Sequence, residues 1–467
     1  MQAKLHRWAG EDPSRRFGDL FNLVYDPMFL AEAWYRVRSN AGSRTPGIDG
    51  ATVVYVENRI GVGAFLEEIR ASLKSGEFWP MPVRRVMIPK KSGKLRALGI
   101  PTLADRVVQA ALKLVLEPVF EADFQPCSYG FRPNRRAHDA IAEIHHLTSA
   151  TRKYHWVLEA DIRACFDQID HGALMERVRA RIKDKQVLAL VKAFLKAGIM
   201  TADGTREEAY TGTPQGGILS PLLANIALSA LDDHFTGQWQ QQMHTQYQRR
   251  KRHQQGQGNW RLIRYADDFV VLVDGQRRHA EELRGAVAAI LEPLGLQLAE
   301  EKTRVVHIDE GFDFLGFTIR RMRKPGTSKH YVYTVPSKKA TQAVKDKVAE
   351  KTYRSTLHLD PATLITSINR TLTGWANYYR HGVSAAVFHK IDYHAWNRIM
   401  RWLRRKYKGR TGLGMPELRR RFCLPGTWKF AHNGAVFTGA SSVTVTRYRY
   451  RGTLIPSPFT PPAATPG

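Results

Sequence analysis

The stretch RLIRYADDFVVLV, residues 261–273, places two adjacent carboxylates between two apolar runs. Leu262 and Ile263 precede the acidic pair and residues 269–273 follow it, and both runs have the β-branched and aromatic composition of strands. Asp267 and Asp268 therefore predict the turn of a β-hairpin. Neighbouring carboxylates repel each other and are costly to hold beside an apolar sheet, so this pair requires nearby positive charge.

A divalent metal ion would supply that charge, because Mg²⁺ prefers carboxylate oxygens and leaves coordination positions open for phosphate. Asp161 ends the apolar run 156–160 and is the expected third carboxylate. Three carboxylates at the ends of antiparallel strands would hold two ions about 3.5–4 Å apart for in-line phosphoryl transfer. An Asp-Asp pair alone is more often a solvated turn. The ordered pattern of Asp161, the Gly-rich loop TPQGG and this hairpin favours the metal site.

The composition favours a polyanionic partner. The 467 residues predict roughly three domains, and 71 Lys and Arg against 43 Asp and Glu give a formal net charge of +28. The basic residues are spread along the chain, which argues against a membrane-surface helix. The plain alternative is a soluble basic protein of ribosomal type.

Cysteine usage and hydropathy favour a cytoplasmic protein. The three cysteines form no CxxC pair, which excludes a disulfide framework and argues against a zinc module. We find no run of about 18 apolar residues and no secretory signal at the start, so no membrane partner is expected.

Periodicity predicts alternating helices and strands. Helices are expected within 18–75, around the turn-rich TPGIDG, and over 104–122, 135–149, 278–293 and 338–408, with another helix opening at Pro221. Strands are expected as a basic-tipped hairpin over 83–100, as a strand over 156–161, as the hairpin at 261–273, and near 303–308 and 313–320. Residues 236–260 are expected to form an exposed insertion or loop. SVTVTRYRY (442–450) has strand character, and PSPFTPPAATPG (456–467) has a disorder-prone composition.

The order and wording of several blocks resemble the reverse transcriptases encoded by group II introns, over roughly residues 20–410. The matching blocks are TPGIDG, IPKKSGKLRALGIPTLADRVVQAAL, SYGFRPNRRAHDAI, DIRACFDQIDH, GTPQGGILSPLLANIALSALD, RYADDFVVL, FDFLGFTI and INRTLTGWANYYR. The resemblance implies an α+β right-hand polymerase with fingers, an antiparallel-sheet palm and a helical thumb. The implied domains are an N-terminal extension and start of the fingers (1–80), fingers and palm (81–335), thumb or maturase domain (336–410), and a basic DNA-binding segment with a disordered tail (411–467).

The resemblance assigns roles at the centre of the palm. It places the metal ligands on Asp161, Asp267 and Asp268, adds Ile162 to the metal-binding set, and implies two Mg²⁺ ions with Mn²⁺ as a substitute. Phe166 matches the steric gate, an aromatic ring that leaves no room for a 2′-OH and so selects dNTPs. Core packing is the alternative for this ring.

The resemblance also implies nucleotide, primer and RNA contacts. Lys90, Lys94 and Arg96 would reach the triphosphate, or form a solvated hairpin tip, and Gln215 and Gly216 would lie beside the incoming nucleotide. Phe314, Leu315 and Gly316 resemble the primer grip, although strand core is an equal reading. The basic residues Arg401, Arg404, Arg405 and Lys406 would bind structured RNA, which proteins read mainly by shape and backbone.

These inferences together predict an RNA-directed DNA polymerase in a nucleoprotein complex of the bacterial cytoplasm. Its expected partners are template RNA, intron RNA, a DNA primer or target and dNTPs, and it would also assist splicing and retrohoming as a maturase. A splicing-only RNA-binding maturase and a host-serving reverse transcriptase in repair or phage defence are the alternatives. Degenerate maturases lose palm carboxylates, whereas all three are present here. The lack of cysteine after Cys423 predicts no zinc-dependent HNH nuclease, so priming would need a pre-existing 3′ end. The oligomeric state is left open.

Overall fold

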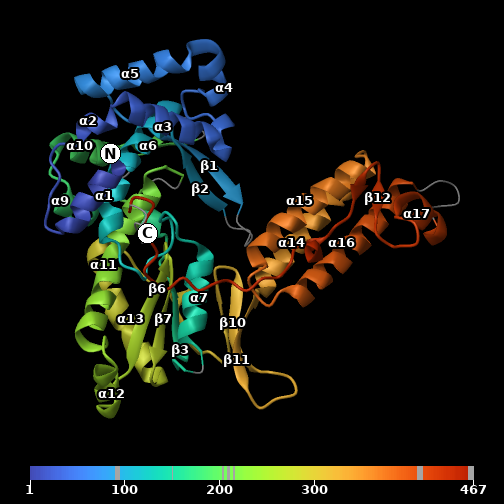
Figure 1. Cartoon of the computed structure of the whole chain (residues 1–467). Helices are drawn as coiled ribbons and strands as arrows, with labels where there is room; N and C mark the ends of the chain where they lie inside the picture. The colour runs from blue at the N-terminus through green and yellow to red at the C-terminus, as the bar shows by residue number, and fades with distance from the viewer. Residues whose placement is uncertain are drawn as a thin grey trace, which may run out of the picture. The chain divides into compact units, whose positions relative to one another are not determined.

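The computed structural model describes residues 1–89, 95–149, 151–201, 205–207, 211–213, 216–407 and 414–460. The chain divides into two units that do not follow the sequence continuously (Figure 1). Unit 1 comprises residues 1–136 and 157–305 together with the C-terminal residues from 452, and unit 2 comprises residues 137–156 and 306–451. Both units mix helices with sheet, as expected for the α+β right-hand fold.

The first part of unit 1 is a helical layer built around the long helix α6. Helix α6 (Leu103–Asp123) is buried along most of its length, and α1 (Gln2–Glu11) and α3 (Pro27–Ser39) pack on it. The Thr102 hydroxyl accepts a hydrogen bond from the Asp105 amide and caps α6, which satisfies a backbone donor at the start of the helix. Shorter helices complete the layer: α2 (Phe21–Val24), α4 (Val53–Tyr55) and α5 (Val62–Ser75).

The hairpin expected over residues 83–100 is confirmed. Strands β1 (Val83–Pro89) and β2 (Leu95–Ile100) pair antiparallel, and β4 (Ile199–Met200) and β5 (Arg206–Glu207) extend them into a sheet of order β2-β1-β4-β5. The tip of this hairpin lies outside the described residues.

The second sheet of unit 1 has the order β6-β7-β3-β8. It contains β6 (Asn259–Tyr265), β7 (Asp268–Asp274), β3 (Trp156–Asp161) and β8 (Arg304–His307). Residues 269–273 of β7 are fully buried, and α11 (Ser220–Gln242) and α13 (Arg277–Leu291) contact β6 and β7 respectively. The remaining helices of the unit are α8 (Cys165–Gln168), α9 (His171–Arg181), α10 (Lys185–Lys196) and α12 (Gln246–Gln254). The antiparallel pairing of β6 with β7 confirms the hairpin expected at 261–273.

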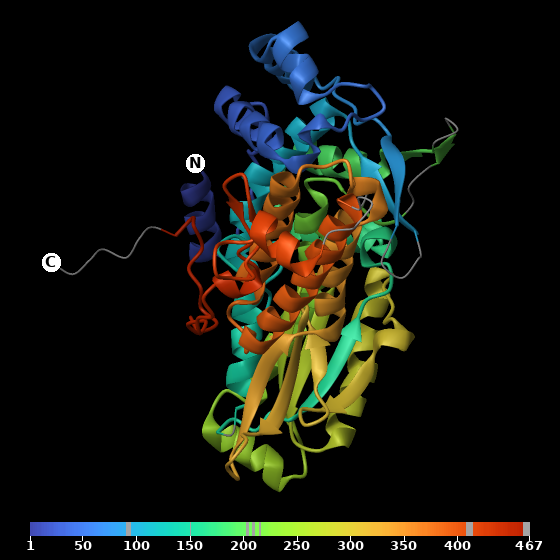
Figure 2. The same cartoon turned by 90° about the vertical axis from the view of Figure 1, so that its right-hand side faces the viewer.

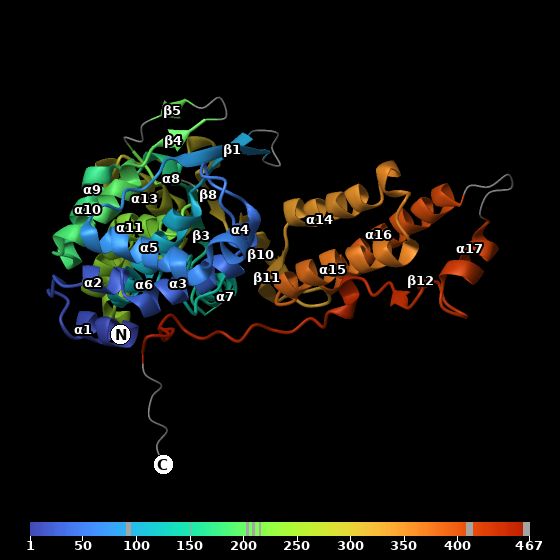
Figure 3. The same cartoon turned by 90° about the horizontal axis from the view of Figure 1, so that it is seen from above.

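Unit 2 joins a three-stranded sheet to a helical bundle. The sheet has the order β11-β10-β9, from β9 (Phe312–Phe314), β10 (Phe317–Arg323) and β11 (His330–Pro336), and Figure 2 shows the long hairpin of β10 and β11. Helices α14 (Lys338–Lys351), α15 (Pro361–Tyr379) and α16 (Ala385–Lys406) lie side by side in Figure 3. The unit also contains α7 (Ala137–Leu147), α17 (Met415–Phe422), β12 (Ala431–His432) and β13 (Ala435–Val436).

Two expectations from the sequence need correction. Residues 236–260 are largely exposed, as expected, but they are mostly helical rather than a loop, because α11 runs to Gln242 and a capping box between Thr245 and Gln248 starts α12, in a segment rich in the good helix formers Gln and Arg. Residues 443–451, named here the C-terminal strap, form no strand. The side chains of the strap bond to α7 instead, as when Arg451 pairs with Asp139 through two hydrogen bonds of 2.9 and 2.6 Å.

Part of the segment expected to be disordered is packed. The Asn134 side chain donates to the Pro456 carbonyl (3.3 Å), and the Phe459 ring lies 5.8 Å from that of His6. Residues 461–467 lie outside the described part of the chain. Among the residues that the structure describes, we find no helix with the length and apolar character to cross a membrane.

Candidate functional site

The acidic pair lies at a tight turn between β6 and β7. Tyr265 pairs with Asp268, so Ala266 and Asp267 form a two-residue turn. Ala266 has a φ of +58°, as hairpin turns of this length require at their first central position. A neighbouring backbone presses on the turn, because a Cβ added to Gly130 would lie 2.3 Å from the Ala266 nitrogen. Only glycine fits that approach.

Asp161 lies at the end of β3, which is the neighbour of β7 in the sheet. Burial raises the pKa of Asp267, and repulsion from Asp161 adds to that rise, while Arg96 and Lys302 oppose it. The pKa of Asp268 is raised to about 6, chiefly by desolvation and then by repulsion from Asp267 and Asp161, although its side chain still reaches solvent. Asp161 is therefore close enough to Asp267 and Asp268 to help raise the pKa of both carboxyls.

A lysine partly neutralises this acidic group. The Lys302 ammonium donates a hydrogen bond to Asp161 Oδ2, which raises the lysine pKa. The side chain of Lys302 is 60% exposed, so it is held by this ion pair rather than by packing. Within the described ranges, no group of three or more His, Cys, Asp or Glu side chains is arranged so that it could hold a metal ion. The oxygen-only donors and the cation already attracted to Asp161 fit a hard divalent ion such as Mg²⁺.

Ile162 follows Asp161 with a buried side chain and bridges to Leu298. Because an isoleucine side chain offers no ligand atom, any contact of Ile162 with a metal would use its main-chain oxygen.

Phe166 lies in α8, five residues beyond Asp161, with a half-buried side chain. The Gly-rich loop is held against this helix, because Gly212 N–H donates to the Ile169 carbonyl (2.8 Å) and Thr213 N–H donates to the Phe166 carbonyl. The ring of Phe131 meets Phe166 edge-on, with centroids 6.4 Å apart and planes at 78°. Phe131 is itself 48% exposed and has a φ of +58°. A second aromatic ring therefore stands beside the expected steric gate.

The structure describes only part of the expected nucleotide pocket. Lys90, Lys94 and Gln215 lie outside the described residues. Arg96 has an exposed side chain on β2, and its charge favours the ionised form of Asp267. Gly216 has a φ of +114°, and a Cβ there would lie 2.6 Å from the Gly99 carbonyl oxygen, so the Gly-rich loop touches β2 at this point.

The expected primer grip forms a tight turn in unit 2. Phe314 is buried and packs as strand core, whereas Leu315 and Gly316 are half-exposed with φ values of +48° and +82°. The Tyr378 hydroxyl donates to the Leu315 carbonyl (2.9 Å). The aromatic residues of GWANYY thus support this turn.

The four basic residues of α16 divide into two kinds. Arg401, Arg404 and Arg405 are exposed, as their helical spacing predicts. Lys406 is half-buried instead, because its ammonium donates to the Leu357 carbonyl (2.7 Å) and lies 5.5 Å from the Trp402 ring centre. This lysine supports the bundle rather than extending the exposed basic face.

Sequence reasoning missed three residues of the site: Phe131, Arg264 and Lys302. The available signals were an aromatic residue in SYGFRP, an arginine inside an apolar strand beside two acids, and a lysine before β8. Arg264 is completely buried and donates to the Ala266 carbonyl in the acidic turn (2.9 Å).

Comparison with known proteins agrees with this architecture. Residues 88–319 match the family model for reverse transcriptase (RNA-dependent DNA polymerase), and residues 341–422 match the maturase-specific domain of group II introns. Protein YkfC of Escherichia coli (strain K12) is 39% identical over 364 residues, which cover 73% of this chain and 93% of that protein. The group II intron-encoded protein LtrA of Lactococcus lactis subsp. cremoris is 32% identical over 372 residues, covering 70% of this chain and 60% of LtrA.

Among solved structures, telomerase from Candida albicans in complex with a telomeric RNA fragment aligns with a TM-score of 0.40 and 13% identity, over 74% of this chain and 63% of that chain. From the two family matches and the extent of the likeness to YkfC and LtrA, the chain belongs to the group II intron-encoded reverse transcriptase and maturase family of RNA-directed DNA polymerases.

Proposed function

We propose that this chain extends a DNA primer on an RNA template by two-metal transfer of dNTPs to the primer 3′-OH. The observation that carries the proposal is the electrostatic coupling of Asp161, Asp267 and Asp268, two of which have raised pKa values. Such repulsion is retained in proteins where a bound cation or reaction needs it. The ion pair between Lys302 and Asp161 is a further sign that the site attracts cations.

Asp161, Asp267 and Asp268 would hold two Mg²⁺ ions, with Mn²⁺ as a substitute and the main-chain oxygen of Ile162 as a further ligand. Bound there, the ions would lower the pKa of the attacking hydroxyl and stabilise charge on the leaving pyrophosphate. Arg96, with Lys90 and Lys94, would bind triphosphate oxygens, and Gln215 and Gly216 would contact the nucleotide. Phe166 would exclude the 2′-OH of an rNTP.

The maturase part of the proposal rests on the second unit. Residues 341–422 match the maturase-specific domain, and the exposed arginines of α16 lie within that range. We propose that this surface binds structured intron RNA and so assists splicing and retrohoming. Leu315 and Gly316 would hold the primer end. The functional division would follow residues 1–80, 81–335, 336–410 and 411–467, the last acting on DNA.

The proposal is tested by Asp267→Asn, which keeps the size of the side chain and removes its charge. Primer extension on an RNA template should fall by several orders of magnitude, because metal stabilisation of the transition state is worth several kcal/mol and each 1.4 kcal/mol is about tenfold. Asp274→Asn is the matched control, since Asp274 ends the same strand and its carboxylate pairs with His253 (2.9 Å).

Equilibrium binding of the primer–template duplex should be nearly unchanged in both variants. Extension by Asp267→Asn at the rate of the parent protein would refute the metal site. Loss of duplex binding together with extension would instead assign the aspartate to nucleic-acid contact.

A further inference from the structure

Arg264 carries a full charge in the centre of the unit 1 core. Its side chain and that of its partner Asp232 are both 0% exposed. Burying an ion pair removes both charges from water, and a pair of apolar side chains of similar volume is often at least as stable. The pair therefore calls for an explanation other than stability.

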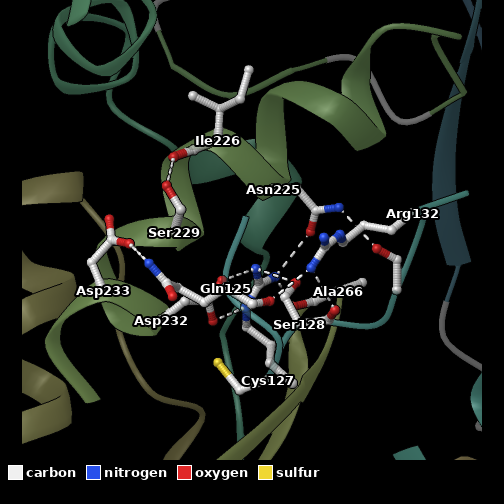
Figure 4. Close-up of polar contacts among 12 residues, drawn as sticks. Gln125, Cys127, Ser128, Arg132, Asn225, Ile226, Ser229, Asp232, Asp233 and Ala266 are labelled. Carbon is white, nitrogen blue, oxygen red and sulfur yellow. Dashed lines mark hydrogen bonds and ion pairs between the residues drawn. The ribbon is translucent and has the colours of Figure 1, made fainter. Parts of the chain in front are cut away.

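The guanidinium uses all five of its N–H groups. Nε donates to Asp232 Oδ1 (2.8 Å), and Nη2 donates to Asp232 Oδ2 and to Ser128 Oγ (2.8 Å). Nη1 donates to Asn225 Oδ1 (3.0 Å) and to the Ala266 carbonyl (2.9 Å). Figure 4 shows Asn225, Asp232, Ser128 and Ala266 converging from α11, from the loop after α6 and from the acidic turn.

The loop after α6 holds the same turn from a second side. Arg264 N–H donates to the Cys127 carbonyl (2.9 Å), and Tyr129 N–H donates to the Arg264 carbonyl (2.8 Å). Asn225 Nδ2 donates to the Gly130 carbonyl (2.8 Å), and Gly130 is the residue that lies against the Ala266 nitrogen.

A second buried ion pair fixes the loop after α6. Arg132 pairs with Glu121, and both side chains are 3% exposed. Arg132 Nη1 also donates to the carbonyl groups of Gln125 (2.7 Å) and Ser128 (3.0 Å). Helix α11, this loop and the acidic turn are thus one hydrogen-bonded body.

We infer that Arg264 is a positioning residue, which fixes the Ala266 carbonyl and thereby the location of Asp267 and Asp268. This inference rests on the proposed function of the two aspartates. The effect is geometric rather than electrostatic, because Asp232 neutralises the guanidinium and the cations that oppose the raised pKa of Asp267 are Arg96 and Lys302. The planar guanidinium of Arg264 thus fixes the turn that carries Asp267 and Asp268, whose carboxylates repel each other.

Arg264→Lys tests the inference while keeping the positive charge. An ammonium can still pair with Asp232, but it cannot reproduce the planar fork that reaches Asn225, Ser128 and Ala266 together. A misplacement of about 1 Å can lower a rate by 10²-fold, so kcat for primer extension should fall by about that factor. The KM for the primer–template duplex should stay the same, and the Mg²⁺ concentration for half-maximal extension should rise.

A readout that needs no catalysis is the hydrogen exchange of residues 265–268 in the metal-free protein. Exchange there should be faster in Arg264→Lys, because the turn loses its fixed carbonyl. Arg181→Lys is the matched control, since Arg181 is also buried (5% exposed) and donates to the carbonyl groups of Ala9 (2.8 Å) and Asp12 (3.1 Å). The control should lower thermal stability without changing the Mg²⁺ requirement or exchange at the turn.

Asn225→Ala provides a second test should the lysine variant fail to fold, because it removes one acceptor of Arg264 and the donor to Gly130. It should show the same changes in kcat, Mg²⁺ requirement and exchange. The inference is overturned if the folded variant keeps the parent kcat, or if only its melting temperature changes. Asp267→Asn, measured in parallel, distinguishes this failure from failure of the metal site itself, because only the latter leaves that variant active.

Discussion

At the scale of a single residue, Asp268 shows how the acidic turn lowers the stability of the fold. Its raised pKa, about 6, means that the ionised carboxyl is less favourable in the fold than in the unfolded chain. Below the pKa of the unfolded chain, such an acid is protonated in both states and does not change the free energy of unfolding. As the pH rises from that value through the higher pKa of the folded state, the unfolded chain loses its proton first, so the free energy of unfolding falls. Asp268 therefore makes a contribution that lowers the stability of the fold as the pH rises from about 4 to about 6.

We expect Asp268→Asn to raise the melting temperature of the metal-free protein by a few degrees at pH 8 and by less at pH 5. Thermal denaturation at the two pH values, in the presence of a chelator, measures the difference. Added Mg²⁺ should reduce the advantage of the variant, because it relieves the repulsion in the parent. Equal melting curves at pH 8 would count against mutual repulsion in the turn.

Phe131 leads to a second prediction at the residue scale. An edge-to-face aromatic pair is worth about 0.5–1.5 kcal/mol, so losing the support of Phe131 should lower discrimination by Phe166 between dNTP and rNTP roughly two- to tenfold. The measurement is the ratio of kcat/KM for the two nucleotides in Phe131→Ala.

Phe166→Ala should lower the same ratio further, and Trp79→Ala, at an aromatic residue 76% exposed, should leave it unchanged. An unchanged ratio in Phe166→Ala would assign Phe166 to the core and place sugar selection elsewhere.

At the scale of an element, helix α16 carries the exposed arginines that we propose bind RNA. Neutralising phosphates releases counterions, so log affinity should fall with log salt by about 0.7–0.9 per phosphate contact. Joint replacement of Arg401, Arg404 and Arg405 by Ala should weaken binding to a structured RNA and flatten this slope. Extension at saturating duplex should change little.

Lys406→Ala is the matched control on the same helix, because Lys406 bonds to the Leu357 carbonyl. It should lower stability and leave the salt slope unchanged. The same slope in the triple variant and the parent would remove this face from the RNA-binding surface.

The sequence predicted elements well where one segment carried its own signal. The hairpin at 261–273 was readable because apolar strands flank a turn, and α11 was readable from Pro221 at its start. The strap was misread because Tyr448, Tyr450 and Arg451 bond to a helix some 300 residues earlier in the chain. Arg264 was missed for the same reason, since its partners Ser128 and Asp232 are remote in sequence.

At the scale of the whole molecule, unit 2 combines two separate segments, and the strap fastens one to the other. Asp139, only 2% exposed, accepts hydrogen bonds from Arg451 and from the Tyr448 hydroxyl, and the His146 ring stacks on Tyr450 at 4.7 Å. We expect Arg451→Ala to lower the free energy of unfolding by roughly 1–3 kcal/mol, because a buried carboxylate loses a charged donor.

Chemical denaturation measures that loss, and Arg449→Ala, which removes a neighbouring exposed arginine, is the control. Asp139→Asn combined with Arg451→Ala should recover part of the stability, since no unpaired charge stays buried. A double variant no more stable than Arg451→Ala would argue against the ion pair as the source of the loss.

The strap also determines when unit 2 can finish folding during synthesis of the chain. Helix α7 leaves the ribosome long before residues 448–451, which satisfy its acidic side chains. At about 5–20 residues per second, the interval of 312 residues between Asp139 and Arg451 takes roughly 15–60 s. During that interval the nascent chain carries α7 without the tyrosine and arginine donors that later bond to Asp139 and Glu143, so unit 2 can complete its folding only after residue 451 has been synthesised.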